Sequence, residues 1–269
     1  MNTPQQKLFK VLLIGDSCED RFVYGRCNRL NPEAPVPVLD YLREDIKGGM
    51  CLNVAENLKS FNIKVDIITN SEKILKTRYI DEVSNQQLLR VDSEQKIEPY
   101  SSTVDLSLYD AVVISDYNKG FITEEFLFRL TSKKKCPIFI DSKKTNLPKE
   151  NCFIKINELE YSKIETPSDN IIVTLGGKGS MFRNRIYNTK NIETRDIIGA
   201  GDTFLSALVF GYLYYESIDK AINLANLAAG ISVSYPGIYT LTKKDVSKII
   251  NLCNWYWWYY LHQWWMWCM

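Results

Sequence analysis

The sequence predicts an α/β protein with a doubly wound, mostly parallel sheet, helices on both faces and a small β flap. Three observations predict it: short apolar runs rich in Val and Ile, helical patterns between them, and one proline-rich segment that breaks the alternation. Strands buried on both faces have such continuous apolar runs. Alternating strands and helices are typical of an open sheet with right-handed crossovers. The 269 residues suffice for one domain with a sizeable core.

Six apolar runs are the expected strands. They are KVLLIGD (10–16), VDIITN (65–70), AVVISD (111–116), PIFID (137–141), FIKIN (153–157) and IIVTLG (171–176). Helical patterns lie at 51–61, 123–134, 158–164, 202–215, 218–234 and 242–252. Four of the strands end in Asp16, Asp116, Asp141 or Asn157. Because ligands bind at the carboxyl ends of strands in such sheets, these residues predict one cleft, although Asp and Asn also begin turns and cap helices.

Residues 22–47 are the expected flap. The segment has prolines at 32, 35 and 37 within a β-like pattern. Proline is confined to sheet edges and strand starts, so the pattern predicts a small β flap that projects from the main sheet. An exposed β edge invites pairing with another copy, and we therefore expect a homodimer.

Charge and cysteine content narrow the possible partners and location. Lys and Arg number 33 against 32 Asp and Glu, which argues against a nucleic-acid partner. The seven cysteines are scattered without a CxxC pair, so a reducing cytoplasm is expected rather than a disulfide framework or a zinc site. The N-terminal MNTPQQKLFK lacks the apolar run of a signal peptide.

Residues 253–269 form an aromatic-rich tail that differs from the expected domain, residues 1–252. All six tryptophans lie between Trp255 and Trp267, and the only histidine, His262, is there too. One explanation is a different origin, such as a change of reading frame. The other is an interfacial membrane anchor, since Trp and Tyr favour the membrane boundary. A transmembrane helix is not expected, because the uncharged stretch is short and rich in aromatics rather than Leu, Ile and Val.

The strongest local signal is DIIGAGDTFLSALVFG, residues 196–211. Gly199, Ala200 and Gly201 precede a strong helix pattern, so backbone N–H groups can approach a ligand closely. A helix N-terminus suits a phosphate. Asp202 at the helix start could accept a hydroxyl proton while the turn stabilises a phosphoryl group in transit. The alternative is that Asp202 is only an N-cap and the glycines only a tight turn.

GAGDTF followed by a small-residue helix resembles the second signature of the pfkB, or ribokinase-like, family of carbohydrate kinases. The resemblance implies a ribokinase-like fold, with ATP as the phosphoryl donor to a small-molecule sugar. It also implies that Asp202 is the catalytic base and that Gly199, Ala200 and Gly201 form the anion hole. Ile197 departs from the residues that are usual at its position.

Further segments agree with the family in chain order: GDSCED (15–20), GGMCLNVAENL (48–58), INELE (156–160), TLGGKGS (174–180) and ANLAAG (225–230). For the sugar, the resemblance implies Asp20, Gly48, Gly49 and Asn53. For the nucleotide and Mg²⁺ it implies Asn157, Glu160, Thr174, Gly176, Gly179 and Asn226, with Glu160 reaching the metal through water. A dependence on a monovalent cation stays open.

One branch of the family fits best. NPEAPVPVLD (31–40), KTRYI (76–80), QQLLRVD (86–92), ISDYNKG (114–120) and IDSKK (140–144) resemble the kinase domain of D-glycero-D-manno-heptose 7-phosphate kinase. The resemblance implies phosphorylation of the anomeric hydroxyl, O1, of a sugar that already carries a phosphate. Substrate residues in these segments would be Asp116 and the cations Lys76, Arg78, Arg90, Lys119 and Lys143. The two arginines rank first because they grip phosphate in a bidentate manner, and some of the five cations are expected to be solvated surface charges.

Two departures keep other functions open. The helix and strand that heptose kinases have between the segments matching Asn70 and Lys76 are missing, and no nucleotidyltransferase domain follows. The first alternative is a kinase for another sugar or for a nucleoside. The second is a catalytically degenerate protein that binds nucleotide or sugar. The third is a membrane-associated protein that uses its tail.

Overall fold

The structure, a computed structural model, describes residues 8–133, 135–189 and 193–254. Within them, an eight-stranded sheet has the order β12-β11-β10-β9-β8-β7-β1-β4. From β4 to β10 the neighbouring strands are parallel, and β11 and β12 add an antiparallel edge. The strands are β1 (Lys10–Gly15), β4 (Lys64–Thr69), β7 (Ala111–Asp116), β8 (Ile138–Ser142), β9 (Phe153–Asn157), β10 (Ile171–Thr174), β11 (Ser180–Phe182) and β12 (Arg185–Tyr187).

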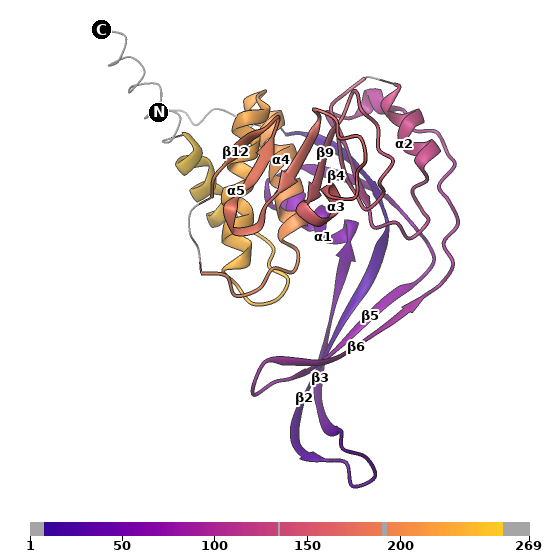
Figure 1. Cartoon of the computed structure of the whole chain (residues 1–269), viewed down its shortest axis with the longest axis vertical. Coiled ribbons are helices and arrows are strands. Elements are labelled where there is room, and N and C mark those ends of the chain that lie inside the picture. The colour runs from indigo at the N-terminus through magenta and orange to yellow at the C-terminus, as the bar shows by residue number, and fades with distance from the viewer. Residues whose placement is uncertain (1–7, 134, 190–192, 255–269) are drawn as a thin grey trace.

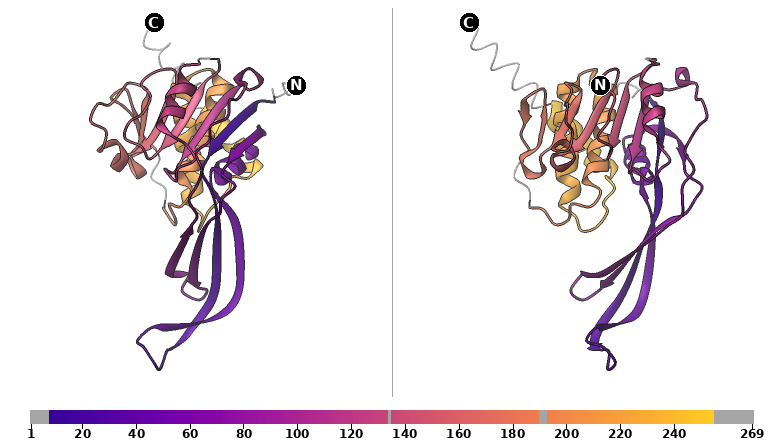
Figure 2. Two further views of the ribbon diagram at one scale, coloured as in Figure 1. Left: turned by 90° about the vertical axis from the view of Figure 1, so that its right-hand side faces the viewer. Right: turned by 45° about the vertical axis from the view of Figure 1, so that its right-hand side comes forward.

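Helices cover both faces of this sheet (Figure 2). One face packs against α1 (Cys51–Ser60), α4 (Ala200–Tyr215), α5 (Ile218–Val233) and a helical segment at 243–254. The other packs against α2 (Glu124–Thr131), α3 (Glu158–Tyr161) and the 3₁₀ turn η1 (Leu106–Leu108). Val11 and Leu13 of β1 point to the first face, and Leu12 and Ile14 to the second. This alternation explains why the strands are apolar at every position.

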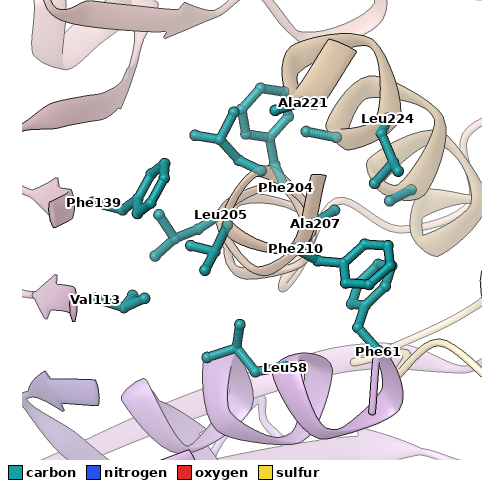
Figure 3. Close-up of a cluster of buried hydrophobic side chains, with 14 of the residues drawn as sticks. Leu58, Phe61, Val113, Phe139, Phe204, Leu205, Ala207, Phe210, Ala221 and Leu224 are labelled. Atoms are coloured by element: carbon teal, nitrogen blue, oxygen red, sulfur yellow. The ribbon is translucent and has the colours of Figure 1, made fainter. Parts of the chain in front are cut away.

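Helix α4 is deeply buried where it approaches the site. Every residue from Asp202 to Gly211 is buried, because the helix lies between the sheet, α1 and α5 (Figure 3). Phe210 stacks on Phe61 with ring centroids 4.7 Å apart. At Gly211 a Cβ would lie 2.8 Å from the Cα of Ala221, so only glycine allows α4 and α5 to approach this closely.

A second, four-stranded sheet forms the flap and extends away from the main body (Figure 1). Its order is β3-β2-β5-β6, with strands at Ser17–Leu30 (β2), Pro37–Met50 (β3), Ile74–Asp81 (β5) and Gln86–Glu94 (β6). The flap is therefore larger than the expected 22–47. The sequence analysis missed β5 and β6 as strands because polar and charged side chains interrupt both of them and β6 is exposed throughout.

The predicted fold class is confirmed. The six expected strands and the expected helices of the α/β body are present with ends shifted by a few residues, and the 3₁₀ turn η2 (Gly176–Lys178) with the β11–β12 hairpin was not expected. Strand β4 is one edge of the sheet, and all its residues are exposed or half-buried. In the described part of the chain, no helix has the length and apolar character needed to cross a bilayer. Residues 255–269 of the predicted tail, with His262, lie outside it.

We expect Phe210→Ala to lower the free energy of unfolding by about 3–5 kcal/mol, because it removes a buried ring and leaves a cavity beside Phe61. Urea unfolding followed by circular dichroism measures it. Phe128→Ala on α2 is the matched control, since Phe128 is 42% exposed and its loss should cost on the order of 0.5 kcal/mol. Equal losses in the two variants would contradict the assignment of the core.

Candidate active site

Neighbouring side chains closely approach two glycines in the turn before α4. Gly199 has φ 78°, in the left-handed region that favours glycine, and a Cβ there would lie 2.9 Å from Nδ2 of Asn53. At Gly201 a Cβ would lie 2.8 Å from Nζ of Lys155. The first backbone N–H groups of the 16-residue helix α4 have no partner within the helix, and they lie beside the ammonium group of Lys155. This combination suits an anion.

Asp202 lies in the first turn of α4 and is only 5% exposed. Nδ2 of Asn53 donates to its Oδ2 at 2.7 Å, and the hydroxyl of Tyr117 donates to its Oδ1 at 2.9 Å. Burial raises the pKa of Asp202 to about 6, and the charge of Asp141 acts in the same direction. The two hydrogen bonds and the charge of Lys155 oppose this rise. Asp202 does not act as a side-chain N-cap of α4, since the N-cap position is Gly199.

Lys155 is a buried cation that the sequence analysis did not single out. It lies in β9, and its Nζ donates to Oδ2 of Asp141 in β8 at 2.7 Å. Burial acts to lower its pKa, but the charges of Asp141, Asp202 and Glu160 raise the pKa on balance. Lysine is rarely buried without a partner, so a lysine inside the apolar run FIKIN was the signal that could have found it.

Two cavities meet at the start of α4. The larger measures about 620 Å³ and the smaller about 160 Å³. Lys155, Asn157 and Gly201 line both of them, while Asp202 lines only the smaller. A ligand in the larger cavity can therefore present one end to Lys155 and Gly201, next to a second ligand at Asp202.

The predicted nucleotide residues come together around the larger cavity. Gly179 has φ 97°, and a Cβ there would collide with the carbonyl oxygen of Tyr187, so this turn requires glycine. Nδ2 of Asn226 donates to the same carbonyl at 2.9 Å. The residues from the sequence analysis that line this cavity are Asn157, Thr174, Gly176, Gly179, Ala200, Gly201 and Asn226.

Glu160 lines the smaller cavity. Asn157 caps α3, and the Glu160 carboxylate accepts from the Asn157 backbone N–H at 2.9 Å. Burial acts to raise the pKa of Glu160, but this hydrogen bond and Lys143, whose Nζ lies at 3.0 Å, lower it on balance. Magnesium bound with nucleotides keeps several waters and needs only one or two protein carboxylates. An ionised Glu160 fits that need, and the described residues contain no cluster of three metal-ligating side chains.

The predicted sugar residues form two groups. Asn53 contacts Asp202 directly. Asp20 and Arg78 pair with each other where the flap joins the body, and both are buried. A Cβ at Gly49 would collide with the Asp20 carboxylate, whereas one at the neighbouring Gly48 would lie 2.8 Å from the Cβ of Leu52. These glycines therefore allow the flap strand β3 to pass close to Asp20 and α1.

Three predicted substrate residues have protein partners instead. Arg90 is half exposed on β6 and pairs with Asp92 at 2.9 Å. Lys119 pairs with Glu94, and neither Arg90 nor Lys119 lines either of the two cavities. The side chain of Asp116 has no exposed surface, because Lys144 and the Ser142 hydroxyl bind its carboxylate at 2.8 and 2.6 Å. Asp116 also accepts from the backbone N–H of Asn118 in the loop after β7, and it is nevertheless one of the residues that line the smaller cavity.

Sequence comparison decides the family. Residues 157–245 match the family described as "pfkB family carbohydrate kinase". Among curated relatives, the bifunctional protein HldE of a Nitratiruptor species is 30% identical over 89% of this chain and 64% of its own length. HldE of Helicobacter pylori (strain J99) is 30% identical over 90% of this chain and 66% of its own length. The chain belongs to the pfkB carbohydrate kinase family. It spans less than two thirds of the length of the first of these relatives.

Solved structures agree with the fold of this pfkB kinase. Ribokinase from Thermotoga maritima superposes with a TM-score of 0.67 at 15% identity, over 91% of this chain and 100% of that one. Phosphofructokinase-2 from Escherichia coli in complex with potassium gives 0.66 at 14% identity, over 92% of this chain and 100% of that one. Ribokinase from Arabidopsis thaliana complexed with ribose and ATP gives a TM-score of 0.64 at 13% identity, over 90% of this chain and 99% of that one. At these identities the likeness concerns the fold alone.

We expect Asp202→Asn to stabilise the folded kinase at pH 8. A carboxyl whose pKa is about 6 when folded and lower when unfolded destabilises the fold progressively as pH rises from the unfolded value to the folded one, and the penalty is complete above it. The neutral replacement should raise the free energy of unfolding by as much as about 2 kcal/mol, which corresponds to several degrees in Tm. Thermal unfolding between pH 4 and pH 8 measures this, and the advantage should shrink as pH falls through 6. An advantage that is the same at every pH would contradict the raised pKa.

Proposed function

We propose that this chain transfers the γ-phosphoryl group of ATP to a sugar hydroxyl, with Asp202 as the base. The observation that carries the proposal is the position of Asp202: a buried carboxylate at the start of α4, facing a small cavity that adjoins a larger one. A pKa of about 6 leaves the carboxylate ionised at neutral pH yet basic enough to accept a proton. The sugar hydroxyl would lie in the smaller cavity and the nucleotide in the larger.

The transferring group would lie between Lys155 and the turn formed by Gly199, Ala200 and Gly201. Backbone N–H groups of this turn and the positive end of α4 would stabilise the charge on the phosphoryl oxygens. Lys155 would add a full positive charge at the same point, where both cavities meet. Phosphoryl transfer depends mainly on positioning and on charge neutralisation, and this arrangement supplies both.

Magnesium, when bound, neutralises the nucleotide phosphates. Glu160 would hold it through water, and Lys143 would have to share or release the carboxylate that it contacts at 3.0 Å. The larger cavity would take the nucleotide through Thr174, Gly176, Gly179 and Asn226. A monovalent cation remains an open requirement.

For the substrate we propose O1 of D-glycero-D-manno-heptose 7-phosphate. The relatives named HldE and the matching sequence segments support it. Lys143 lines the smaller cavity, and Lys76 lies 5.7 Å from the ring centroid of Tyr117, which also lines it. These two lysines support the proposal better than Arg90 and Lys119, which have carboxylate partners away from both cavities. Arg78 is paired with Asp20, so it would contact the sugar phosphate only if Asp20 binds Arg78 and the sugar hydroxyls at the same time. Another sugar or a nucleoside is the alternative, because the sheet is shortened at β4.

We further propose a domain boundary, an oligomeric state and a location. The kinase domain would span 1–252 and the aromatic tail 253–269. The exposed flap would pair with a second copy to give a homodimer. The cytoplasm, which contains ATP and keeps thiols reduced, would be the location. A binding protein without catalysis is the competing function, and the intact turn before α4 argues against it.

Asp202→Asn should lower kcat by at least about 10²-fold and leave the affinity for ATP nearly unchanged, because only proton transfer is lost. Release of ADP from Mg·ATP, measured with a panel of sugars that includes D-glycero-D-manno-heptose 7-phosphate, checks the first point. Calorimetric titration with ATP checks the second. Near-normal turnover in the variant would refute Asp202 as the base. ATP binding without turnover on any sugar in the unaltered protein would favour the binding protein.

Lys155→Met should lower kcat by about 10²- to 10³-fold, because one preorganised charge at the transferring group is lost. The change also leaves Asp141 buried without its partner, which destabilises the fold. Lys155→Met combined with Asp141→Asn restores neutrality and should recover stability without recovering turnover. ADP-release kinetics and thermal unfolding separate the two effects. Recovery of kcat in the double variant would show that Lys155 acts only on stability.

A further inference from the structure

Tyr117 is held rigidly at the end of β7. Its backbone N–H donates to Oδ2 of the fully buried Asp16 at 2.7 Å. The same carboxylate accepts from the backbone N–H groups of Lys119 at 3.3 Å and Phe121 at 3.4 Å. One buried carboxylate thus fixes the loop that follows the strand. The direction in which the Tyr117 side chain leaves the backbone is set by this loop.

The side chain of Tyr117 hydrogen-bonds to the base, and two cations lie near its ring. Its hydroxyl donates to Oδ1 of Asp202 at 2.9 Å. The ring has Nζ of Lys143 at 5.1 Å and Nζ of Lys76 at 5.7 Å from its centroid, within the range of cation–π attraction. Tyr117, Lys143 and Asp202 all line the smaller cavity.

We infer that Tyr117 is a positioning residue with two separable functions: its hydroxyl orients the carboxylate of Asp202, and its ring holds Lys76 and Lys143 where an anionic substrate binds. This inference deepens the proposed function and rests on it for the substrate. Neither function follows from the residues that the family resemblance singled out.

The hydroxyl function follows from the two donors on Asp202. Asn53 occupies one carboxylate oxygen and Tyr117 the other, so the plane of the carboxylate is fixed. Each oxygen keeps a second lone pair for a substrate hydroxyl. The terminal torsion of Asp is otherwise broad, and a misplaced base reacts more slowly. Burial, followed by the charges of Asp202 and Asp141, raises the pKa of Tyr117 well above 10, so its hydroxyl remains a donor at neutral pH.

The ring function follows from the surroundings of the two lysines. A lysine ammonium sits on a flexible stem and needs a fixed neighbour to hold it in place. Within the described residues, Lys76 forms no ion pair with a carboxylate, and Lys143 has Glu160 alone. The aromatic ring attracts both ammonium groups without neutralising them. Lys76 therefore keeps its positive charge for a phosphate group, whereas Lys143 shares its charge with Glu160.

Two variants separate the functions in ADP-release kinetics. Tyr117→Phe keeps the ring and removes the hydroxyl. We expect a fall in kcat of about 10-fold or more, a shift of the acid limb of kcat/KM to higher pH, and an unchanged KM for D-glycero-D-manno-heptose 7-phosphate. Tyr117→Leu removes both and should also raise the KM for this sugar phosphate, but not for D-glycero-D-manno-heptose without phosphate. An unshifted pH profile in the Phe variant, or equal KM changes for the two sugars in the Leu variant, would overturn the corresponding function.

Tyr109→Phe is the matched control. Its hydroxyl donates to Asp66 at 3.0 Å, at the β4 edge of the sheet, and it lines neither cavity. It should leave kcat, KM and the pH profile unchanged. A change in the control as large as that in Tyr117→Phe would mean that loss of a half-buried tyrosine hydroxyl acts through the fold.

A second readout needs no substrate. Carboxyl ¹³C NMR of the free protein, with Asp202 assigned through Asp202→Asn, follows its titration. Tyr117→Phe should raise the pKa of Asp202 above about 6, because a donor to the ionised form is lost while Cys51, Asn53, Asp141 and Lys155 still face it. An unchanged titration overturns the orienting hydrogen bond. If the unaltered protein turns over no sugar, the proposed function fails, and this titration still decides the hydroxyl function.

Discussion

Burying the negative charge of Asp202 is unfavourable unless neighbouring groups offset the lost hydration. The groups that do so come from several elements and define the site. Asn53 comes from α1, Tyr117 from the loop after β7, and Lys155 from β9. Each approaches from a different element, so the carboxylate fixes how α1, α4 and the sheet meet. The balance leaves the pKa near 6, between that of a solvated aspartate and that of an uncompensated buried one.

The small residues before α4 leave space for two of the groups that offset the burial of Asp202. Gly201 leaves space for Lys155, and Gly199 takes a left-handed conformation beside Asn53. The Lys155–Asp141 pair brings a positive charge to the helix start without leaving an ammonium unpaired in the interior. The side chains of Asn53 and Lys155 therefore help to shape this turn.

The family-like motifs gave most of the predicted site, because they are local: residues that line the larger cavity sit on turns whose glycines are visible in the sequence. The predicted substrate residues depend less on such motifs. The cations Arg90 and Lys119 and the carboxylate of Asp116 lie in matching segments, yet each has a protein partner that no local pattern reveals. Lys155 was missed for the opposite reason, since it looks like an interruption of an apolar strand until β8 brings Asp141 to it.

The sequence by itself determined the order of strands and helices in the α/β body, because parallel strands buried on both faces and amphipathic helices have distinct periods. It also determined the turn before α4, whose small residues are contiguous. Only the tertiary structure decided that β5 and β6 join the flap, that Tyr117 reaches Asp202, and which cations remain free of carboxylates. These depend on contacts between residues far apart in the chain, such as the 85 positions that separate Tyr117 from Asp202, or on pairings between polar strands, where periodicity carries no information about the partner.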